Sequence, residues 1–521
     1  MSRRWILTVD LGTGGPKTAA VALDGEVLAT SFTPVETEHT ADGGATQDVA
    51  AWWSGIGAAT RAFVADGVVD PRGLHAVGLT GQFASTVPVD EHGRPVSDCL
   101  MWSDTRGAGY SQETVGGPVA GYAPLALAAG IRYACGAPPP TGEGPQSNEL
   151  YLRRDRPEIW ARTATLLEPA DYLALRCTGR AAATPASMCL SFLVDTRPGR
   201  PRRYVPELAR RFHRDPARLP RLHPTGSVLG PLLPDVADEL GVAPGAPVLC
   251  GAPDKLAGYL GSGAVGPRDG HLAISSTGWI SCSVPFRKVD PVHSIVTIPG
   301  VDDTSHLVWA DQLAAGSCLQ WWREQAFPAV RGGAPDERGP ASYDELVQAA
   351  GSVAPGSNGV MFLPWLHGEL VPFSDSALRA GFVNLSPTSG HAAMTRAVLE
   401  GVALNTRAMM EAVERFVKRP FPSLRIIGGG ARSDLWCQIM ADTLGVPVEQ
   451  VDNPAHAQLR GMALLARVSL GELSLAEAAA LVPVAHTFQP RPPVQAVYDE
   501  AYVSFRSFYR GTRGTYRRLH R

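Results

Sequence analysis

The chain has 521 residues, of which 45% are hydrophobic, and a formal net charge of −3. Its length exceeds what one hydrophobic core usually serves, so we expect at least two sizeable domains. The balanced charge gives no electrostatic reason to expect nucleic acid or a membrane surface as a partner. Eight scattered cysteines without a C-x-x-C argue against a disulfide framework or a zinc cluster. No window approaches ~18 uninterrupted apolar residues, so we expect a soluble, cytoplasmic protein.

The first element is a β-hairpin around VDLGTGGPKT, residues 9–18. Its glycine spacing fits neither a P-loop nor a dinucleotide fingerprint, since Pro16 precedes Lys17. The apolar run that follows closes at Asp24-Gly25, a hairpin signal, which predicts strands over 5–10 and 17–23 and a third strand beyond. A glycine-rich turn can present backbone N–H groups to an anion. Taken alone, a turn whose glycines only relieve strain is the simpler interpretation.

The rest of the first half alternates regular and broken segments. Residues 46–66 predict a helix that Thr46 or Asp48 can cap, and LHAVGLTGQ predicts a strand. Residues 133–147 form a Pro/Gly-rich loop. The stretch from 148 to 179 is mostly helical in pattern, and a second broken stretch follows near residue 200.

A second hairpin opens the other half of the chain. PVLCG predicts a strand that leads to Asp254 and a helix of small residues, and HLAISSTGWISCSV predicts strand, turn and strand. Two hydroxyl-glycine hairpins half a chain apart predict two facing halves of similar design. We therefore divide the chain into residues 1–250 and 251–505, followed by a basic tail over 506–521, for which a solvated tail or helix face is the simplest interpretation.

A long helix and a glycine-rich junction complete the pattern. Five apolar residues recur at roughly helical spacing: Val398, Val402, Met409, Val413 and Phe416. A strand, the run Gly428-Gly429-Gly430, a helix and another strand follow. Singly, these features have ordinary explanations, because Asp254 is also a good helix cap and three glycines also suit a tight strand–helix junction.

Together, in this order, the motifs resemble the FGGY carbohydrate kinases of the actin-like ATPase superfamily. The resemblance rests on Asp10 to Lys17, GAPDKLAGYLGSGAV around Asp254, SSTG at 275–278, and GGGARSDLWCQIMADTLGVPV from Gly428. MWSDTRG, AAGSCLQWWRE and FLPWLHGEL support it, so it runs from residue 5 to about 470. It implies an α/β fold of two actin-like (ribonuclease H-like) domains that flank a central cleft. It also implies ATP-dependent phosphorylation of a small sugar, nearest to the xylulokinases and a ketopentose such as xylulose.

The resemblance also assigns roles to residues. Asp254 is implied as the catalytic base, and Asp10 as the residue that orients Mg²⁺, through water. The implied ATP contacts are Thr13, Lys17, Thr277, Gly278, Gly316, Gln320, Gly429 and Gly430. The candidate sugar contacts are Gln82, Phe83, Trp102, Asp104, Arg106 and Lys255. We expect the helix N-terminus to keep Asp254 ionised, as a base requires.

Several positions depart from the family pattern. Phe83-Ala84 stands where the xylulokinase-like members have Met-His, which leaves the identity of the sugar open. Lys255 replaces a small polar residue and offers a cation to a hydroxyl or a carboxylate. Ser276 replaces a glycine, and Leu370 replaces an arginine.

Alternatives remain for individual residues and for the whole chain. Trp102 is equally a core residue, and Arg106 is equally an ion-pair partner of Asp104. A kinase of another polyol, a ketohexose or a sugar acid fits the same machinery. A non-catalytic actin-like regulator is the second class, but it has no need of a base such as Asp254. The resemblance leaves a homodimer open.

Overall fold

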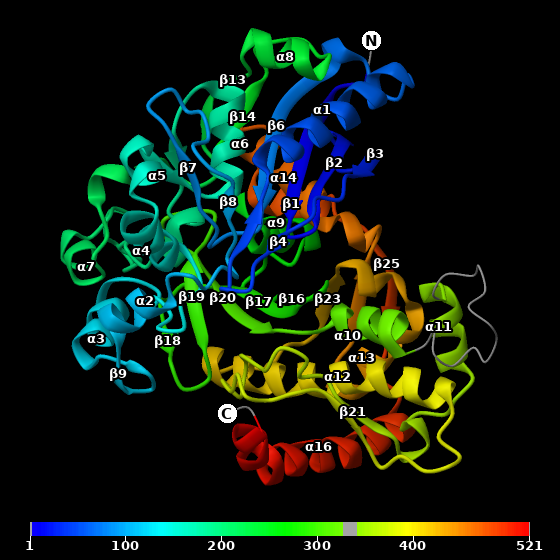
Figure 1. Cartoon of the computed structure of the whole chain (residues 1–521). Coiled ribbons are helices and arrows are strands. Elements are labelled where there is room, and N and C mark those ends of the chain that lie inside the picture. Colours follow the sequence, from blue (N-terminus) through cyan, green and yellow to red (C-terminus); the bar gives the residue numbers. More distant parts are fainter. Residues whose placement is uncertain (1–2, 327–340, 520–521) are drawn as a thin grey trace, which may run out of the picture.

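The computed structural model describes residues 3–326 and 341–519 of the chain, which contain two large β-sheets (Figure 1). The first sheet has the order β13-β14-β6-β1-β2-β3, with β15 paired to β6 beyond β14. Its strands are β1 (Trp5–Gly12), β2 (Gly15–Ala22), β3 (Val27–Phe32), β6 (Leu74–Gly81), β13 (Val228–Pro231), β14 (Pro247–Leu249) and β15 (Ala252–Pro253).

The second sheet has the order β18-β19-β20-β17-β16-β23-β24-β25. Its strands are β16 (Gly270–Ile274), β17 (Gly278–Val284), β18 (Val289–Asp290), β19 (Ile295–Pro299), β20 (His306–Gln312), β23 (Leu424–Ile427), β24 (Val448–Val451) and β25 (Val484–Phe488). Both predicted hairpins are therefore present, as β1–β2 and β16–β17.

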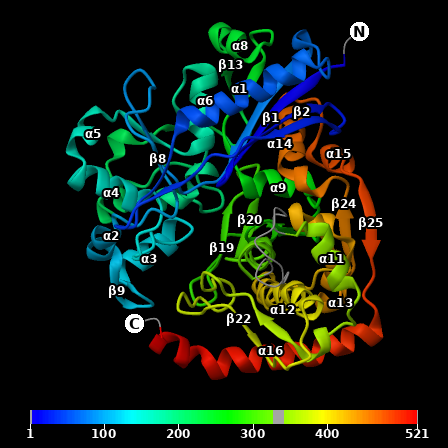
Figure 2. The same ribbon diagram turned by 45° about the vertical axis from the view of Figure 1, so that its right-hand side comes forward.

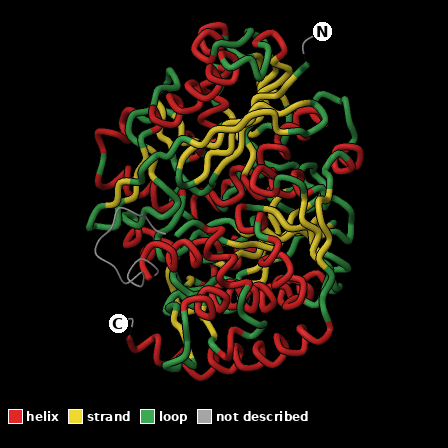
Figure 3. The backbone as a smooth tube through the Cα atoms, turned by 90° about the vertical axis from the view of Figure 1, so that its right-hand side faces the viewer, coloured by secondary structure: helices red, strands yellow, loops and turns green. Residues whose placement is uncertain are grey.

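The two sheets share one pairing pattern. In each, a hairpin (β1–β2 or β16–β17) pairs its second strand antiparallel with a third, β3 or β20. The first strand of each hairpin pairs in parallel with a later strand, β6 or β23. Figure 3 shows the two groups of strands one above the other, with helices between them. This duplication confirms the predicted α/β fold of two actin-like halves.

Short strands occupy the connections. They are β4 (Glu38–His39), β5 (Ala45–Gln47), β7 (Val87–Val89), β8 (Cys99–Leu100), β9 (Gly116–Val119), β10 (Thr165–Leu167), β11 (Ala182–Ala183), β12 (Arg221–Leu222), β21 (Met361–Leu363) and β22 (Gly381–Val383). β10 lies inside the stretch predicted as mostly helical and pairs with β7. Three residues are too few for a strand pattern to be visible in the sequence.

Proline opens many of the helices. The first residue of each helix from α3 to α8 is proline, which fits this position because its missing N–H has no partner there. The helices of the first half are α1 (Val49–Ala65), α2 (Ala108–Val115), α3 (Pro124–Tyr133), α4 (Pro145–Asp155), α5 (Pro157–Arg162), α6 (Pro169–Thr178), α7 (Pro206–Arg211) and α8 (Pro234–Leu240). Asp48 caps α1 by accepting from the Ala50 N–H.

The helices of the second half are α9 (Asp254–Ser262), α10 (Gly316–Trp321), α11 (Tyr343–Gly351), α12 (His391–Val417), α13 (Asp434–Leu444), α14 (Ala457–Ser469), α15 (Leu475–Ala480) and α16 (Pro492–Leu519). α12 and α16 lie below the second sheet in Figure 1. The basic end of the chain thus continues α16 as far as Leu519. No helix of the described ranges is both long and apolar enough to cross a membrane.

Helices α9 and α14 pack against each other between the two large sheets, and Figure 2 shows α14 beside β1 and β2. Their crossing is reciprocal. A Cβ atom added to Gly261 would collide with the carbonyl oxygen of Ala457, and one added to Gly461 would collide with that of Ala257. Each helix therefore brings one glycine and one carbonyl oxygen, four residues apart, to the point of contact.

Three main groups of buried apolar residues follow from this arrangement. One fills the first half around Trp5 and Trp52, and one fills the second half around Phe416 and Trp436. A third lies between the halves, where α9 and α14 meet residues of β1, β2 and β6. All eight cysteines are buried and free, in keeping with the absence of a disulfide framework.

Candidate active site

Three of the predicted site residues, Asp10, Gln82 and Asp254, lie at or near the carboxyl ends of neighbouring parallel strands. β6 pairs in parallel with β1, opposing Asp10 and Thr80, and in parallel with β15, opposing Ala252 and Thr80. Asp254 comes directly after β15. Gln82 comes directly after β6, and its N–H donates to the Leu11 carbonyl over 2.8 Å. Ligands of α/β sheets commonly bind at such carboxyl ends.

Asp10 and Lys17 face each other across the first hairpin. They are opposed in the β1–β2 register, and Lys17 Nζ lies 3.2 Å from Asp10 Oδ2. Asp10 is only 4% exposed, whereas the Lys17 side chain is 40% exposed. The charge of Asp10 raises the pKa of Lys17, and the charge of Asp254 adds to this effect. The ammonium group therefore stays protonated and within the field of both carboxylates.

Asp254 is the first helical residue of α9, and Pro253 occupies the cap position before it. Its Oδ1 is buried and has no hydrogen-bond partner among the described residues. Burial raises the pKa of Asp254 to about 6; the cation of Lys255 opposes this shift, whereas Asp10 and Asp311 add to it. Burial thus outweighs the stabilisation that we expected from the helix N-terminus. The carboxyl group is an anion only above about pH 6.

The turn of the first hairpin lies beside two predicted sugar contacts. Thr13 Oγ1 donates to Gln82 Oε1 over 3.3 Å and accepts from Trp102 Nε1 over 3.4 Å. Gln47, which the sequence did not single out, donates to the Thr13 carbonyl over 2.6 Å. Trp102 is 39% exposed, so it is not a core residue. The structure thus brings together one phosphate-motif residue and two sugar candidates.

Lys255 lies in a cage built by the second sheet. Its ammonium group pairs with Asp311 over 2.9 Å and lies 4.4 Å from the ring centre of Trp279. Trp309 adds a second ring at 5.4 Å, and Phe83 packs on Trp309 with ring centres 5.4 Å apart. Trp309 Nε1 and Asp311 Oδ1 are buried without a partner in the described part of the chain.

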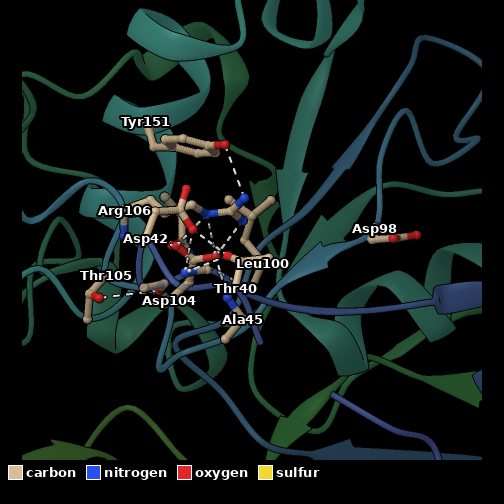
Figure 4. A network of polar contacts seen from close by, with 12 residues as sticks. Thr40, Asp42, Ala45, Asp98, Leu100, Asp104, Thr105, Arg106 and Tyr151 are labelled. Atoms are coloured by element: carbon tan, nitrogen blue, oxygen red, sulfur yellow. Dashed lines mark hydrogen bonds and ion pairs between the residues drawn. The ribbon is translucent and has the colours of Figure 1, made fainter. Parts of the chain in front are cut away.

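Asp104 and Arg106 form an ion pair, one of the two interpretations left open by the sequence (Figure 4). Asp104 is 1% exposed and also accepts from the Ala45 N–H over 3.0 Å. Arg106 donates to the Tyr151 hydroxyl over 3.1 Å and stacks on its ring. In this arrangement the carboxylate holds Arg106 and the chain around Ala45.

The predicted second phosphate motif, SSTG at 275–278, is held in place by backbone hydrogen bonds. The β16–β17 turn spans Ser275 to Thr277, and the N–H groups of Ala315, Gly316 and Ser317 donate to the carbonyls of Ser275 and Ser276. A Cβ on Gly316 would collide with the Ser275 carbonyl oxygen. The turn and the start of α10 therefore form one unit that contains Thr277, Gly278 and Gly316.

The glycine-rich junction lies next to this unit. A Cβ on Gly430 would collide with the side chain of Ile274, the last residue of β16, whereas Gly429 is exposed with open space beside it. The Gly428 N–H donates to the Pro454 carbonyl over 2.8 Å. Gln320 lies one turn along α10 from Gly316, exposed and bonded to Glu324 over 3.1 Å.

Residues that the sequence did not reveal complete the site. Trp279 and Trp309 belong to apolar strands, where an aromatic residue predicts only a sheet. Asp311 is the one exception with a signal, because it is a carboxylate near the end of the apolar strand β20. Among the described residues, no group of three or more His, Cys, Asp and Glu can hold a metal ion.

Comparison with known proteins identifies the family of the chain. The N-terminal domain of the FGGY family of carbohydrate kinases matches residues 5–116, and its C-terminal domain matches residues 285–470. Xylulose kinase of Staphylococcus epidermidis is 24% identical, with 98% of each chain covered. That of Escherichia coli is 28% identical over 96% of this chain and 98% of its own. A ligand-bound xylulose kinase structure from Lactobacillus acidophilus superposes with a TM-score of 0.83 at 20% identity, covering 99% and 100% of the chains. The chain therefore belongs to the FGGY family of carbohydrate kinases and phosphorylates a sugar with ATP.

Proposed function

We propose that the enzyme phosphorylates a small neutral sugar, a ketopentose such as xylulose, with Asp254 as the catalytic base. The observation that carries this proposal is Oδ1 of Asp254, which is buried without a partner among the described residues and whose charge raises the pKa of Lys17, the partner of Asp10. A carboxylate oxygen without a partner among the described residues is available to a hydroxyl of the substrate. The full-length similarity to xylulose kinases supports the choice of sugar.

In this mechanism, Asp254 accepts the proton of the attacking sugar hydroxyl. The hydroxyl oxygen bonds to the γ-phosphorus of ATP, and the bond from that phosphorus to the β–γ bridging oxygen breaks, releasing ADP. Phosphoryl transfer depends mostly on positioning and on neutralising the phosphate charge. Lys17 supplies a cation, and the backbone groups around Thr13 and Thr277 supply N–H donors. Gly316, Gln320, Gly429 and Gly430 would contact the rest of the nucleotide.

Asp10 fits a magnesium ion that arrives with ATP. A single buried carboxylate suits Mg²⁺, which keeps several waters and binds proteins through one or two carboxylates together with the substrate phosphates. The pairing of Asp10 with Lys17 places this carboxylate beside the cation that would meet the same phosphates. Bound there, Mg²⁺ would neutralise phosphate charge.

Lys255 favours a neutral substrate over a sugar acid. Its charge is already balanced by Asp311 at 2.9 Å and held between two indole rings. A substrate carboxylate would have to approach Asp311 as well. The free Nε1 of Trp309 and Oδ1 of Asp311 instead offer one donor and one acceptor, which suits hydroxyl groups.

An ADP-release assay over ketopentoses, ketohexoses, polyols and sugar acids tests the proposal. We expect the largest kcat/KM with a ketopentose and little activity with an aldonic acid. A higher value with an aldonic acid would overturn the assignment of the sugar. ADP release no faster than the hydrolysis background with every compound would instead favour a nucleotide-binding regulator. In either case the division into 1–250 and 251–505 remains our proposal for the two domains.

A further inference from the structure

A basic pocket lies in the first half of the chain, apart from the residues of the candidate active site. Helices α4 and α7 line it, and its volume is about 380 Å³. That volume is within the range of small-molecule sites, about 300–1,000 Å³. Its polar lining consists of Arg153, Arg154, Arg210, His213 and Arg214, and no lining residue that the structure describes is acidic.

Positive charge in the pocket exceeds what the surrounding carboxylates balance. Arg214 is buried and pairs with Glu149, which also lies 3.8 Å from Arg153. Arg154 pairs with Glu113 over 2.8 Å. The recorded ion pairs of the four guanidinium groups thus use two carboxylates.

Arg210 is the free cation of the pocket. It is exposed, and none of the residues described in the structure forms an ion pair or side-chain hydrogen bond with it. Arginines in the last turn of a helix often only balance the helix dipole. Here, however, arginines from two helices and from the segment after α7 face one cavity, which is the arrangement that binds phosphate groups.

The pocket is joined to the candidate sugar site through α4. Arg153 and Arg154 lie on this helix, as does Tyr151, whose hydroxyl accepts from Arg106 (Figure 4). Asn148 of the same helix donates to Thr86 Oγ1 over 3.2 Å and to the Leu100 carbonyl over 3.3 Å. Leu100 is two residues from Trp102. Helix α4 is therefore in direct contact with the segment that carries Trp102 and Arg106.

We propose that this pocket binds a phosphate monoester of a small sugar or polyol, and that binding changes the affinity for the sugar substrate through α4. The fully charged phosphate group pairs with Arg210 and Arg153, and the organic part fills the remaining volume. The binding step is independent of which sugar the enzyme phosphorylates, so it stands or falls separately from the proposed function.

Isothermal titration tests the binding step with the full chain saturated by a non-hydrolysable ATP analogue and Mg²⁺, which fills the phosphate positions of the active site. Ribose 5-phosphate and inorganic phosphate are titrated separately at constant ionic strength, because surface electrostatics depend on salt. We expect one saturable site for ribose 5-phosphate and weaker binding of inorganic phosphate. Equal affinity for both would show that the pocket recognises phosphate alone and would overturn the ester assignment.

Substitutions of pocket arginines test whether ribose 5-phosphate binds in this pocket. Arg210→Ala should weaken ribose 5-phosphate about tenfold, the effect of one charge-assisted hydrogen bond, and Arg153→Ala with Arg210→Ala should weaken it further. Arg200→Ala is the matched control, because Arg200 is an exposed arginine of the same half outside the pocket. Unchanged binding in the double variant, or equal loss in the control, would overturn the proposal.

Steady-state kinetics test whether the anion pocket is coupled to the sugar site. Ribose 5-phosphate should change the KM for the sugar in the wild type and in Arg200→Ala but not in Arg210→Ala, whose kinetics without the anion should match the wild type. Tyr151→Phe should keep the anion site while reducing the change in KM, because it removes the bond to Arg106. A KM that does not respond to the anion in the wild type would refute the coupling through α4.

Discussion

The two hairpins of the molecule have the same pairing but different chemistry. The first, β1–β2, carries an opposed Asp10 and Lys17 and ends in the exposed turn of Thr13 and Gly14. The second, β16–β17, has no ionisable residue in its turn, and Ala315 and the first two residues of α10 donate three backbone N–H groups to it. In the proposed mechanism, one half would therefore supply charge to the phosphates, and the other would supply a neutral backbone surface.

The difference shows how one duplicated fold can divide a task. Charges beside a reacting phosphate must be few and correctly placed, since each carries a cost of burial. A backbone surface adds contacts without that cost. Four measurements, ordered by the size of the expected effect, test whether the halves divide the work in this way.

Asp254→Asn at the junction of the halves should have the largest effect. Loss of the base should lower kcat by ~10²–10⁴-fold while ATP-analogue binding stays near wild type. Because burial raises the pKa of Asp254 to about 6, ionisation above that pH opposes folding. The variant should therefore be more stable at pH 7, by up to about 3 kcal/mol in urea denaturation. Turnover at the wild-type rate would refute the role of base.

Lys17→Met and Thr277→Val compare the hairpins directly. Loss of the ammonium group should lower kcat about 10²-fold, as for other groups that stabilise developing charge. Loss of the Thr277 hydroxyl should cost only about 1 kcal/mol of binding, seen as a several-fold higher KM for ATP. Steady-state kinetics with ATP varied, and circular dichroism as the folding control, provide the measurement. Equal losses in both variants would remove the distinction between the halves.

The pH profile should show an acid limb set by Asp254. A base acts only as the anion, so kcat/KM should fall about tenfold per pH unit below about 6. Lys17 has a raised pKa and stays charged across this range, so it adds no second limb there. Rates from pH 4.5 to 8, with the residual rate of Asp254→Asn as control, test this. A limb that persists in that variant would belong to another group.

Gly316→Ala and Gly429→Ala should differ in their effect on stability. A methyl group on Gly316 meets the Ser275 carbonyl oxygen, so the junction of turn and helix must shift, at a cost of about 1–3 kcal/mol. One on Gly429 has open space, and its effect should stay within about 0.5 kcal/mol. Urea denaturation measures both changes. Equal stability of the two variants would mean that the second hairpin is less rigid than its packing indicates.

The fold was largely predictable because its signals are local. The hairpins follow from glycine turns between apolar runs, and α12 follows from Val398, Val402 and Phe416 at helical spacing. β10 and β15 were not predictable. They have three and two residues and exist only through pairing with distant strands.

The positions of Asp10, Gln82 and Asp254 near strand ends were predictable because their motifs continue a strand pattern. The environment of Lys255 was not, because Asp311 and two tryptophans reach it from strands that follow it in the chain. The raised pKa of Asp254 was also missed, since burial depends on the packing of both halves. The pairing of Asp104 with Arg106 remained open until the orientation of the two side chains was known.

The reciprocal contact of α9 with α14 has a mechanical consequence. At that point backbone touches backbone, so there is no side chain to compress and no gap into which either helix can slide. Helix α14, which also packs against β1, β2 and β6 of the first sheet, is therefore held in one position along α9. One methyl group added at Gly261 or Gly461 would separate the two helices, and because α14 packs on the first sheet it would displace that sheet from α9.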